Sequence, residues 1–139
     1  MAIASDHAGY ALKVALKGEL EALGHEVEDL GTHDEASVDY PDYALRVARA
    51  IEDGRAERGI LICGTGIGMS IAANRWRYVR AAVCHDVSSA RLARRHNDAN
   101  VLCLGARLIG LDVAKDCLRV FLDSVYVGGR HERRVAKLS

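Results

Sequence analysis

This sequence carries no net charge, because its 19 lysine and arginine residues balance 19 aspartate and glutamate residues. The balance excludes the overall electrostatic field that attracts nucleic acid or an anionic membrane surface. Long apolar runs are also missing: none approaches the roughly 18 residues that span a bilayer, and the first residues carry no secretory signal. We therefore expect a cytoplasmic protein that binds neither nucleic acid nor membrane, and any anion site must come from a local cluster of basic side chains.

Proline and paired cysteines are scarce as well. The chain has one proline, and its four cysteines, at positions 63, 84, 103 and 117, form no C-x-x-C pair and no zinc-like spacing. This pattern predicts reduced thiols, without a disulfide framework. Half of the 139 residues are apolar and 27% are charged, which is typical of a compact domain and not of a disordered or fibrous chain. We expect residues 1–139 to form a single domain.

Short apolar runs alternate with segments of helical periodicity along the chain. Residues 59–63 (GILIC) are continuously apolar, which is typical of a central strand in a parallel sheet. Residues 43–52 have apolar side chains at helical spacing and follow Pro41, a common residue at the start of a helix. The alternation predicts an α/β fold, a three-layer α/β/α sandwich around a five-stranded, Rossmann-like parallel sheet. The expected strands are 1–5, 26–30, 59–63, 79–84 and 99–104, and the expected helices are 9–23, 43–52, 69–74, 87–95 and 111–121.

Polar side chains follow several of these strands. In parallel sheets ligands bind beyond the carboxyl ends of the strands, so the residues that come after each strand are the first candidates for a site. Asp6 and His7 follow the first strand, and the third strand ends at Cys63. His85 and Asp86 follow the fourth strand, and Arg107 comes soon after the fifth. A thiol, two histidines, two carboxylates and an arginine are therefore expected at one edge of the sheet.

Two polar segments have a purely structural alternative. Residues 5–9 (SDHAG) could simply cap the following helix, with Asp6 as the capping residue. Residues 96–98 (HND) could be a polar loop between the fourth helix and the fifth strand. We expect both segments at the ligand edge, which favours a functional role. His25 and His33 follow no strand end, and we expect them on the surface.

Residues 63–70 (CGTGIGMS) are the most informative segment. Three glycines at alternate positions allow the backbone to approach a ligand closely, and the helix that follows directs its free amides to the same place. The spacing matches neither a dinucleotide fingerprint nor a P-loop. A thiolate at Cys63 would be stabilised by these amides and by the helix dipole. The alternatives are an ordinary tight turn and a small buried side chain.

Basic residues concentrate in the C-terminal tail, from about residue 128 to residue 139. Arg130 and Arg134 are four residues apart, so on a helix they share one face and could clamp a phosphate together. The alternative is a solvated terminal helix. Arg75, Arg77 and Arg80 form a second basic group, which we expect to be a solvated or interface surface.

Taken together, these segments resemble the type B ribose-5-phosphate isomerase family, which also includes galactose-6-phosphate and allose-6-phosphate isomerases. The resemblance extends over nearly the whole chain, and the order of the segments makes it specific. The matching segments are SDHAG at 5–9, DYPDY at 39–43, GILICGTGIGMSIAAN at 59–74, RHNDANVL at 95–102, LGAR at 104–107 and GGRHxxR at 128–134.

The resemblance implies an isomerase of the pentose phosphate pathway that interconverts D-ribose 5-phosphate and D-ribulose 5-phosphate through an ene-diolate. It implies no cofactor and no metal. It also implies a homodimer or homotetramer whose active site lies at the subunit interface, with the basic tail reaching the partner subunit. The implied site residues are Cys63 as the base; Thr65, Gly64, Gly66 and Gly68 around the ene-diolate; His96 aided by Asp6 for ring opening; His7, Arg107, Arg130 and Arg134 at the phosphate; and Tyr40 and Asn97 along the sugar.

Two alternatives to this function stay open. Residues 75–78 (RWRY) are bulkier than the family pattern, and next to the site they would change the preferred sugar length. The nearer alternative is therefore an isomerase of allose or galactose 6-phosphate. The more distant one is a non-catalytic subunit that binds sugar phosphates, and Cys63 argues against it because such a subunit needs no catalytic thiol.

Overall fold

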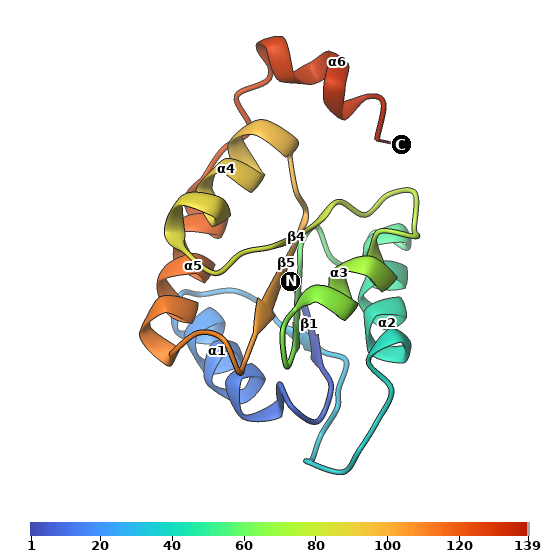
Figure 1. Ribbon diagram of the computed structural model, residues 1–139, viewed down its shortest axis with the longest axis vertical. Coiled ribbons are helices and arrows are strands. Elements are labelled where there is room, and N and C mark those ends of the chain that lie inside the picture. The colour runs from blue at the N-terminus through green and yellow to red at the C-terminus, as the bar shows by residue number, and fades with distance from the viewer. Residues whose placement is uncertain (139) are drawn as a thin grey trace.

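One parallel sheet forms the centre of the protein. A computed structural model describes residues 1–138, in which five strands pair in the order β2-β1-β3-β5-β4 (Figure 1). Every neighbouring pair of strands runs parallel. The expected α/β fold with a five-stranded parallel sheet is therefore confirmed. The strands are β1 (Ala2–Ser5), β2 (Glu28–Asp29), β3 (Gly59–Cys63), β4 (Ala81–Val83) and β5 (Val101–Gly105).

Helices cover both faces of this sheet. They are α1 (Tyr10–Ala22), α2 (Tyr40–Glu52), α3 (Ile67–Ala73), α4 (Val87–Asn97), α5 (Leu111–Asp123), the 3₁₀-helix η1 (Gly129–His131) and α6 (Glu132–Val135). Buried side chains of α1, α4 and α5 form one core on one face, and those of α2 and α3 form a second core on the other (Figure 1). The tail with η1 and α6 lies at one end of the molecule.

The central strand β3 contributes to both cores. Successive side chains of a strand point to opposite faces of the sheet. Ile60 and Ile62 accordingly pack in the core with α1, α4 and α5, whereas Leu61 and Cys63 pack in the core with α2 and α3. The same alternation therefore turns the Cys63 side chain toward the layer that α3 begins.

The edge strands are shorter than the sequence predicts. β2 is confined to Glu28–Asp29 within the expected strand 26–30, and β4 to Ala81–Val83 within 79–84. Each lies at an edge of the sheet and pairs with one neighbour only, so fewer cross-strand contacts stabilise it. The second helix begins earlier than expected, at Tyr40, with Pro41 in its first turn.

Several surface and thiol expectations agree with the structure. All four cysteines are buried free thiols, so the expectation of no disulfide is met. His25 and His33 are exposed. Among residues 1–138, no helix combines the length and the apolar character that crossing a membrane requires.

A buried lysine fastens the loop that follows β2. Lys13 of α1 is fully buried, and its Nζ donates to Asp29 Oδ1 and to the Thr32 carbonyl oxygen, both at 2.6 Å. Burial by itself raises the pKa of Asp29, but hydrogen bonds from Lys13 and the Gly31 amide, together with the lysine charges, lower that pKa overall. The stability gained from the pair is therefore present at neutral pH and is lost as the pH falls through the lowered pKa of Asp29.

Replacing Lys13 with methionine is expected to lower the free energy of unfolding by about 3–5 kcal/mol, because Asp29 loses its buried partner. Urea unfolding at neutral pH measures this loss, which should shrink in acid as Asp29 becomes protonated. Lys17→Met is the control: Lys17 Nζ lies 3.6 Å from Asp29 Oδ2 and its side chain is 35% exposed. Its loss should stay below about 1 kcal/mol, and equal losses in the two variants would contradict the assignment.

Candidate active site

The turn after β3 brings a backbone amide to the Cys63 thiol. The Gly66 amide donates to Cys63 Sγ at 3.1 Å, and the Cys63 side chain is 5% exposed. Gly66 has a left-handed backbone, with φ of 76°, and a Cβ there would come within 3.0 Å of the Leu104 backbone. Only glycine suits this combination of conformation and close approach. The glycine-rich turn therefore holds an N–H group against the sulfur, as the sequence predicts.

Thr65 lies in the same turn and is partly buried. Its Oγ1 accepts a hydrogen bond from the Ile67 amide at 3.2 Å. Its carbonyl oxygen lies 3.3 Å from Nε2 of His85, the residue that follows β4 at the same edge. His85 was predicted at this edge of the sheet but was not among the predicted site residues. The structure adds it as a residue that supports the Thr65 backbone.

Arg107 lies over the beginning of this turn. The amides of Ala106 and Arg107 donate to the carbonyl oxygens of Cys63 and Gly64 at 2.9 and 3.0 Å, which joins the loop after β5 to the loop after β3. A Cβ on Gly64 would come within 3.3 Å of Nη1 of Arg107. An exposed guanidinium therefore lies beside the Cys63 turn.

Asp6 and His7 follow β1 at the same edge. The Asp6 amide donates to the Ile62 carbonyl oxygen at 3.1 Å, and the Asp6 carboxylate accepts from the Gly9 amide at 3.0 Å. The structural alternative, in which Asp6 caps the helix, is not observed, because α1 is capped at Gly9 and the Asp6 carboxylate closes the turn before it. His7 Nδ1 accepts from the Val38 amide at 3.2 Å, so a neutral His7 carries its proton on Nε2.

Tyr40 reaches the same turn from the start of α2. Its ring packs so closely on Gly68 that a Cβ there would lie 2.6 Å from the ring carbon Cζ. A pocket of about 590 Å³ beside this contact is lined by Tyr40, Gly68, Arg75 and Trp76, among others. The bulky segment 75–78 therefore borders one of the residues expected to contact the sugar.

Burial disfavours the thiolate of the other three cysteines. Desolvation raises the pKa of Cys84 to about 11, and it raises the pKa of Cys103 well above the ordinary value. The pKa of Cys117 is also raised, again by burial in the first place. A thiol must ionise to act as a base, so these three are poor candidates for that role.

A second group of polar side chains gathers at the end of α4 and on the tail. The rings of His96 and His131 stack with centroids 4.3 Å apart and planes inclined by 13°. Arg130 and Arg134 line the same pocket of about 410 Å³ as the two histidines and Asn97. Burial, the neighbouring His96 and the two arginine charges lower the pKa of His131. His131 was not among the predicted site residues, although it lies inside the GGRHxxR segment, between the two arginines of the predicted phosphate clamp.

The predicted site residues and His131 form two separate groups, called here the thiol half and the histidine half of the site. The thiol half lies at the carboxyl ends of the strands, and the histidine half lies at the opposite end of the molecule (Figure 1). The expectation that residues 96–98 share the ligand edge is wrong: α4 runs antiparallel to the strands, so its last residues lie at the amino end of β5. The thiol half consists of Asp6, His7, Tyr40, Cys63, Gly64, Thr65, Gly66, Gly68 and Arg107, and the histidine half of His96, Asn97, Arg130, His131 and Arg134.

Comparison with known proteins places the chain in a family. The model of the family described as Ribose/Galactose Isomerase matches residues 1–138. The chain belongs to the ribose/galactose isomerase family. Like the relatives and structures it matches, this member of the ribose/galactose isomerase family is an isomerase, so the non-catalytic alternative is set aside.

Three relatives show how far the similarity extends. The ribose-5-phosphate isomerase B of Escherichia coli (strain K12) is 46% identical over 139 residues, covering all of this chain and 93% of the relative. The D-erythrulose-4-phosphate isomerase of Pectobacterium atrosepticum is 44% identical, covering 99% of this chain and 91% of the relative. The structure of a ribose 5-phosphate isomerase from Thermotoga maritima superimposes with a TM-score of 0.97 at 55% identity, covering 99% and 94% of the two chains.

Proposed function

We propose that this isomerase interconverts D-ribose 5-phosphate and D-ribulose 5-phosphate, with Cys63 as the base. The observation that carries the proposal is the hydrogen bond from the Gly66 amide to Cys63 Sγ, at the end of the central strand. The relatives that are named ribose-5-phosphate isomerases support the substrate. Four buried free thiols suit the reducing cytoplasm, where we propose that the enzyme works.

The chemistry requires a base beside a stabilised oxyanion. The Cys63 thiolate would remove the proton from C2 of the open-chain aldose, and the electrons of that bond would form the C1–C2 double bond of the ene-diolate. Return of this proton to C1, together with transfer of the O2 proton to O1, leaves the carbonyl group at C2 and completes the conversion to the ketose. Thr65 and the amides of residues 64–68 would hold the ene-diolate oxygens, and fixed donors of this kind are worth roughly 2.7–4 kcal/mol each.

Ring opening and phosphate binding would use the other proposed residues. Opening the furanose breaks the C1–O4 bond, removes the proton of O1 and supplies one to O4, and we propose His96, aided by Asp6, for this exchange. The remaining substrate contacts are proposed to be His7, Arg107, Arg130 and Arg134 at the phosphate, and Tyr40 and Asn97 along the sugar.

A complete site would need two copies of the chain. Cys63 and His96 belong to halves at opposite ends of one molecule, so a single substrate does not reach both in the same chain. We propose a homodimer or homotetramer in which the histidine half of one copy, on its basic tail and the end of α4, completes the thiol half of the next. A closed two-fold arrangement would form two such sites at once.

A six-carbon sugar phosphate remains the second candidate substrate. The 590 Å³ pocket beside Tyr40 borders the glycine-rich turn at Gly68, and Arg75 and Trp76 form part of its wall. Allose or galactose 6-phosphate would place its additional carbon within such a space.

The test is isomerisation by the purified protein without added metal. Ribose 5-phosphate, allose 6-phosphate and galactose 6-phosphate are compared by kcat/KM under identical conditions. We expect the highest value for ribose 5-phosphate. Turnover of a six-carbon substrate alone would replace the proposed substrate, and turnover of none of the three would overturn the proposal.

A further inference from the structure

The helix that carries His96 ends at an unusual residue. Asp98 follows the last residue of α4 and has φ of 46° and ψ of 41°, and it is the single non-glycine residue with positive φ in residues 1–138. Glycine adopts this left-handed conformation freely and is the common choice just after a helix. A carboxylate at this position therefore calls for a reason other than ending the helix.

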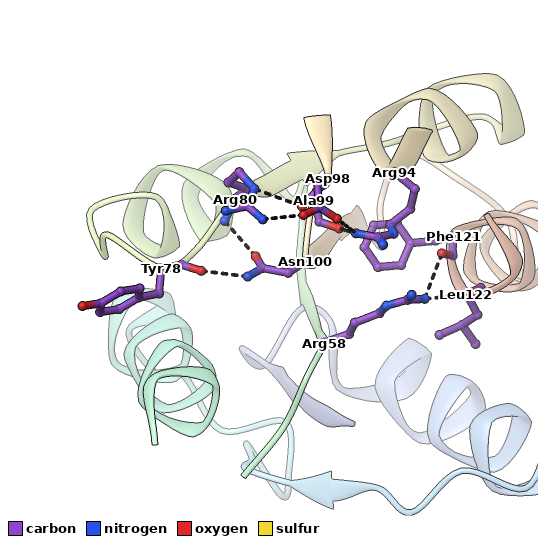
Figure 2. A network of polar contacts seen from close by, with 9 residues as sticks. All are labelled: Arg58, Tyr78, Arg80, Arg94, Asp98, Ala99, Asn100, Phe121 and Leu122. Atoms are coloured by element: carbon purple, nitrogen blue, oxygen red, sulfur yellow. Dashed lines mark hydrogen bonds and ion pairs between the residues drawn. The ribbon is translucent and has the colours of Figure 1, made fainter. Parts of the chain in front are cut away.

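Two arginines hold the Asp98 carboxylate from different elements (Figure 2). Arg94 of α4 donates to Oδ1 at 2.9 Å, and Arg80, just before β4, donates to Oδ2 at 3.0 Å. Arg80 also donates from Nε to the Asp98 carbonyl oxygen at 3.0 Å, and Arg94 donates to the Ala99 carbonyl oxygen at 2.5 Å. Arg94 is 7% exposed, so water replaces these bonds poorly. Arg80 thus differs from the solvated or interface surface expected from the sequence, because it is bonded within the chain to Asp98.

Arg80, which comes just before β4, is itself held in place by Asn100. Asn100 accepts from the Arg80 amide at 2.8 Å and donates to the Tyr78 carbonyl oxygen at 2.7 Å (Figure 2). Arg58 lies in the same region, but it donates to the carbonyl oxygens of Phe121 and Leu122 and makes no hydrogen bond to Asp98. The end of α4 is therefore bonded to the segment that leads into β4, independently of the bonds that Arg58 makes to α5.

This fixed helix end carries His96, two residues before Asp98. Terminal turns of helices fray when their last carbonyl groups and flanking residues are unrestrained. The hydrogen bonds from Arg80 and Arg94 to Asp98, called here the Asp98 clamp, prevent such fraying at the last turn of α4. In that turn the His96 ring stacks on the His131 ring, with centroids 4.3 Å apart. The orientation of the His96 imidazole therefore depends on the backbone that Asp98 holds.

We propose that Asp98, held by Arg80 and Arg94, is a positioning residue that sets the His96 imidazole for opening the sugar ring. The inference rests on the proposed function, because it assigns a partner to the ring-opening histidine. The inference predicts different effects on two kinds of substrate. A sugar phosphate that closes a ring needs His96 in place, whereas one that exists only as an open chain needs the Cys63 turn and not the ring-opening step.

The experiment compares ribose 5-phosphate with 4-deoxyribose 5-phosphate, which lacks O4 and so forms no furanose. Asp98→Asn tolerates the left-handed backbone but removes the charge, and Asp98→Gly keeps the turn without the carboxylate. In both variants kcat/KM for ribose 5-phosphate should fall by about ten- to a hundredfold, as for a misplaced catalytic group, with less than about twofold change for the open-chain probe. His96→Asn should show the same selective loss.

Arg58→Met is the matched control, since it removes a neighbouring arginine that does not bind Asp98. Arg58→Met should change kcat/KM for ribose 5-phosphate and for the open-chain probe by the same factor. Proportional losses in the Asp98 variants would mean that Asp98 only stabilises the fold and would overturn the inference, as would unchanged kinetics on both substrates. A wild-type protein that converts neither substrate would instead overturn the proposed function.

Discussion

Replacing Cys63 with alanine is expected to reduce kcat for ribose 5-phosphate by about a thousandfold or more, because the variant has no group to accept the C2 proton. The fold should persist, since the change removes one buried sulfur atom and keeps the rest of the turn. Steady-state kinetics measure the loss, and thermal unfolding followed by circular dichroism establishes that the variant is folded.

Cys103→Ala is the matched control for this prediction. Cys103 lies on β5 next to β3 and is buried in the same core as Cys63. Burial raises the pKa of its thiol well above the ordinary value, so we expect it to have no part in proton transfer. Its variant should keep wild-type kcat within about twofold, as expected away from the reacting atoms. A fully active Cys63→Ala protein would rule out the proposed base.

Two impaired variants are expected to recover activity on ribose 5-phosphate when they share one oligomer. In a two-fold dimer of Cys63→Ala and His96→Asn chains, one site combines both damaged halves and the other combines both intact halves. Purification through both tags retains only the mixed dimers, so about half of the wild-type activity per dimer should be recovered. Coexpression with two different affinity tags, followed by sequential purification and assay, measures the recovery.

The control pair places both changes in the thiol half. Coexpressed Cys63→Ala and Arg107→Ala chains leave every site with a damaged thiol half, so mixed oligomers should regain no activity. Absence of recovery from the first pair as well would contradict a site shared between two chains. Recovery from both pairs would mean that Arg107 is dispensable.

Local features account for most of what could be predicted. The continuous apolar run at 59–63 indicates a central strand, and the glycines after Cys63 indicate a turn whose amides face the thiol. Both follow from short-range chemistry, because strand burial and left-handed turns depend on neighbouring residues. The proximity of Asp6, Cys63 and Arg107 follows from one further rule, that parallel strands end at the same edge.

Long-range pairing was harder to predict. Nothing near Lys13 in the sequence indicates that Asp29 and Thr32 will surround its ammonium group, because the partners come from a different element. The stacking of His96 on His131 joins residues 35 positions apart, and the clamp on Asp98 depends on Arg80 from another segment. Such contacts depend on how helices pack, which residue spacing does not encode.

By itself, the sequence determined the α/β class, the parallel sheet and the chemical character of the turn at Cys63, because hydrophobic periodicity and glycine conformation act over a few residues. Only the tertiary structure decided what surrounds His96, because its stack on His131 depends on how the C-terminal tail packs against the end of α4. A helix that returns antiparallel to the strands ends at the amino edge of the sheet, so His96 lies away from Cys63 in the same chain. Residues that come just before a parallel strand lie at its amino end, and this is the physical reason that the predicted site divides into two halves.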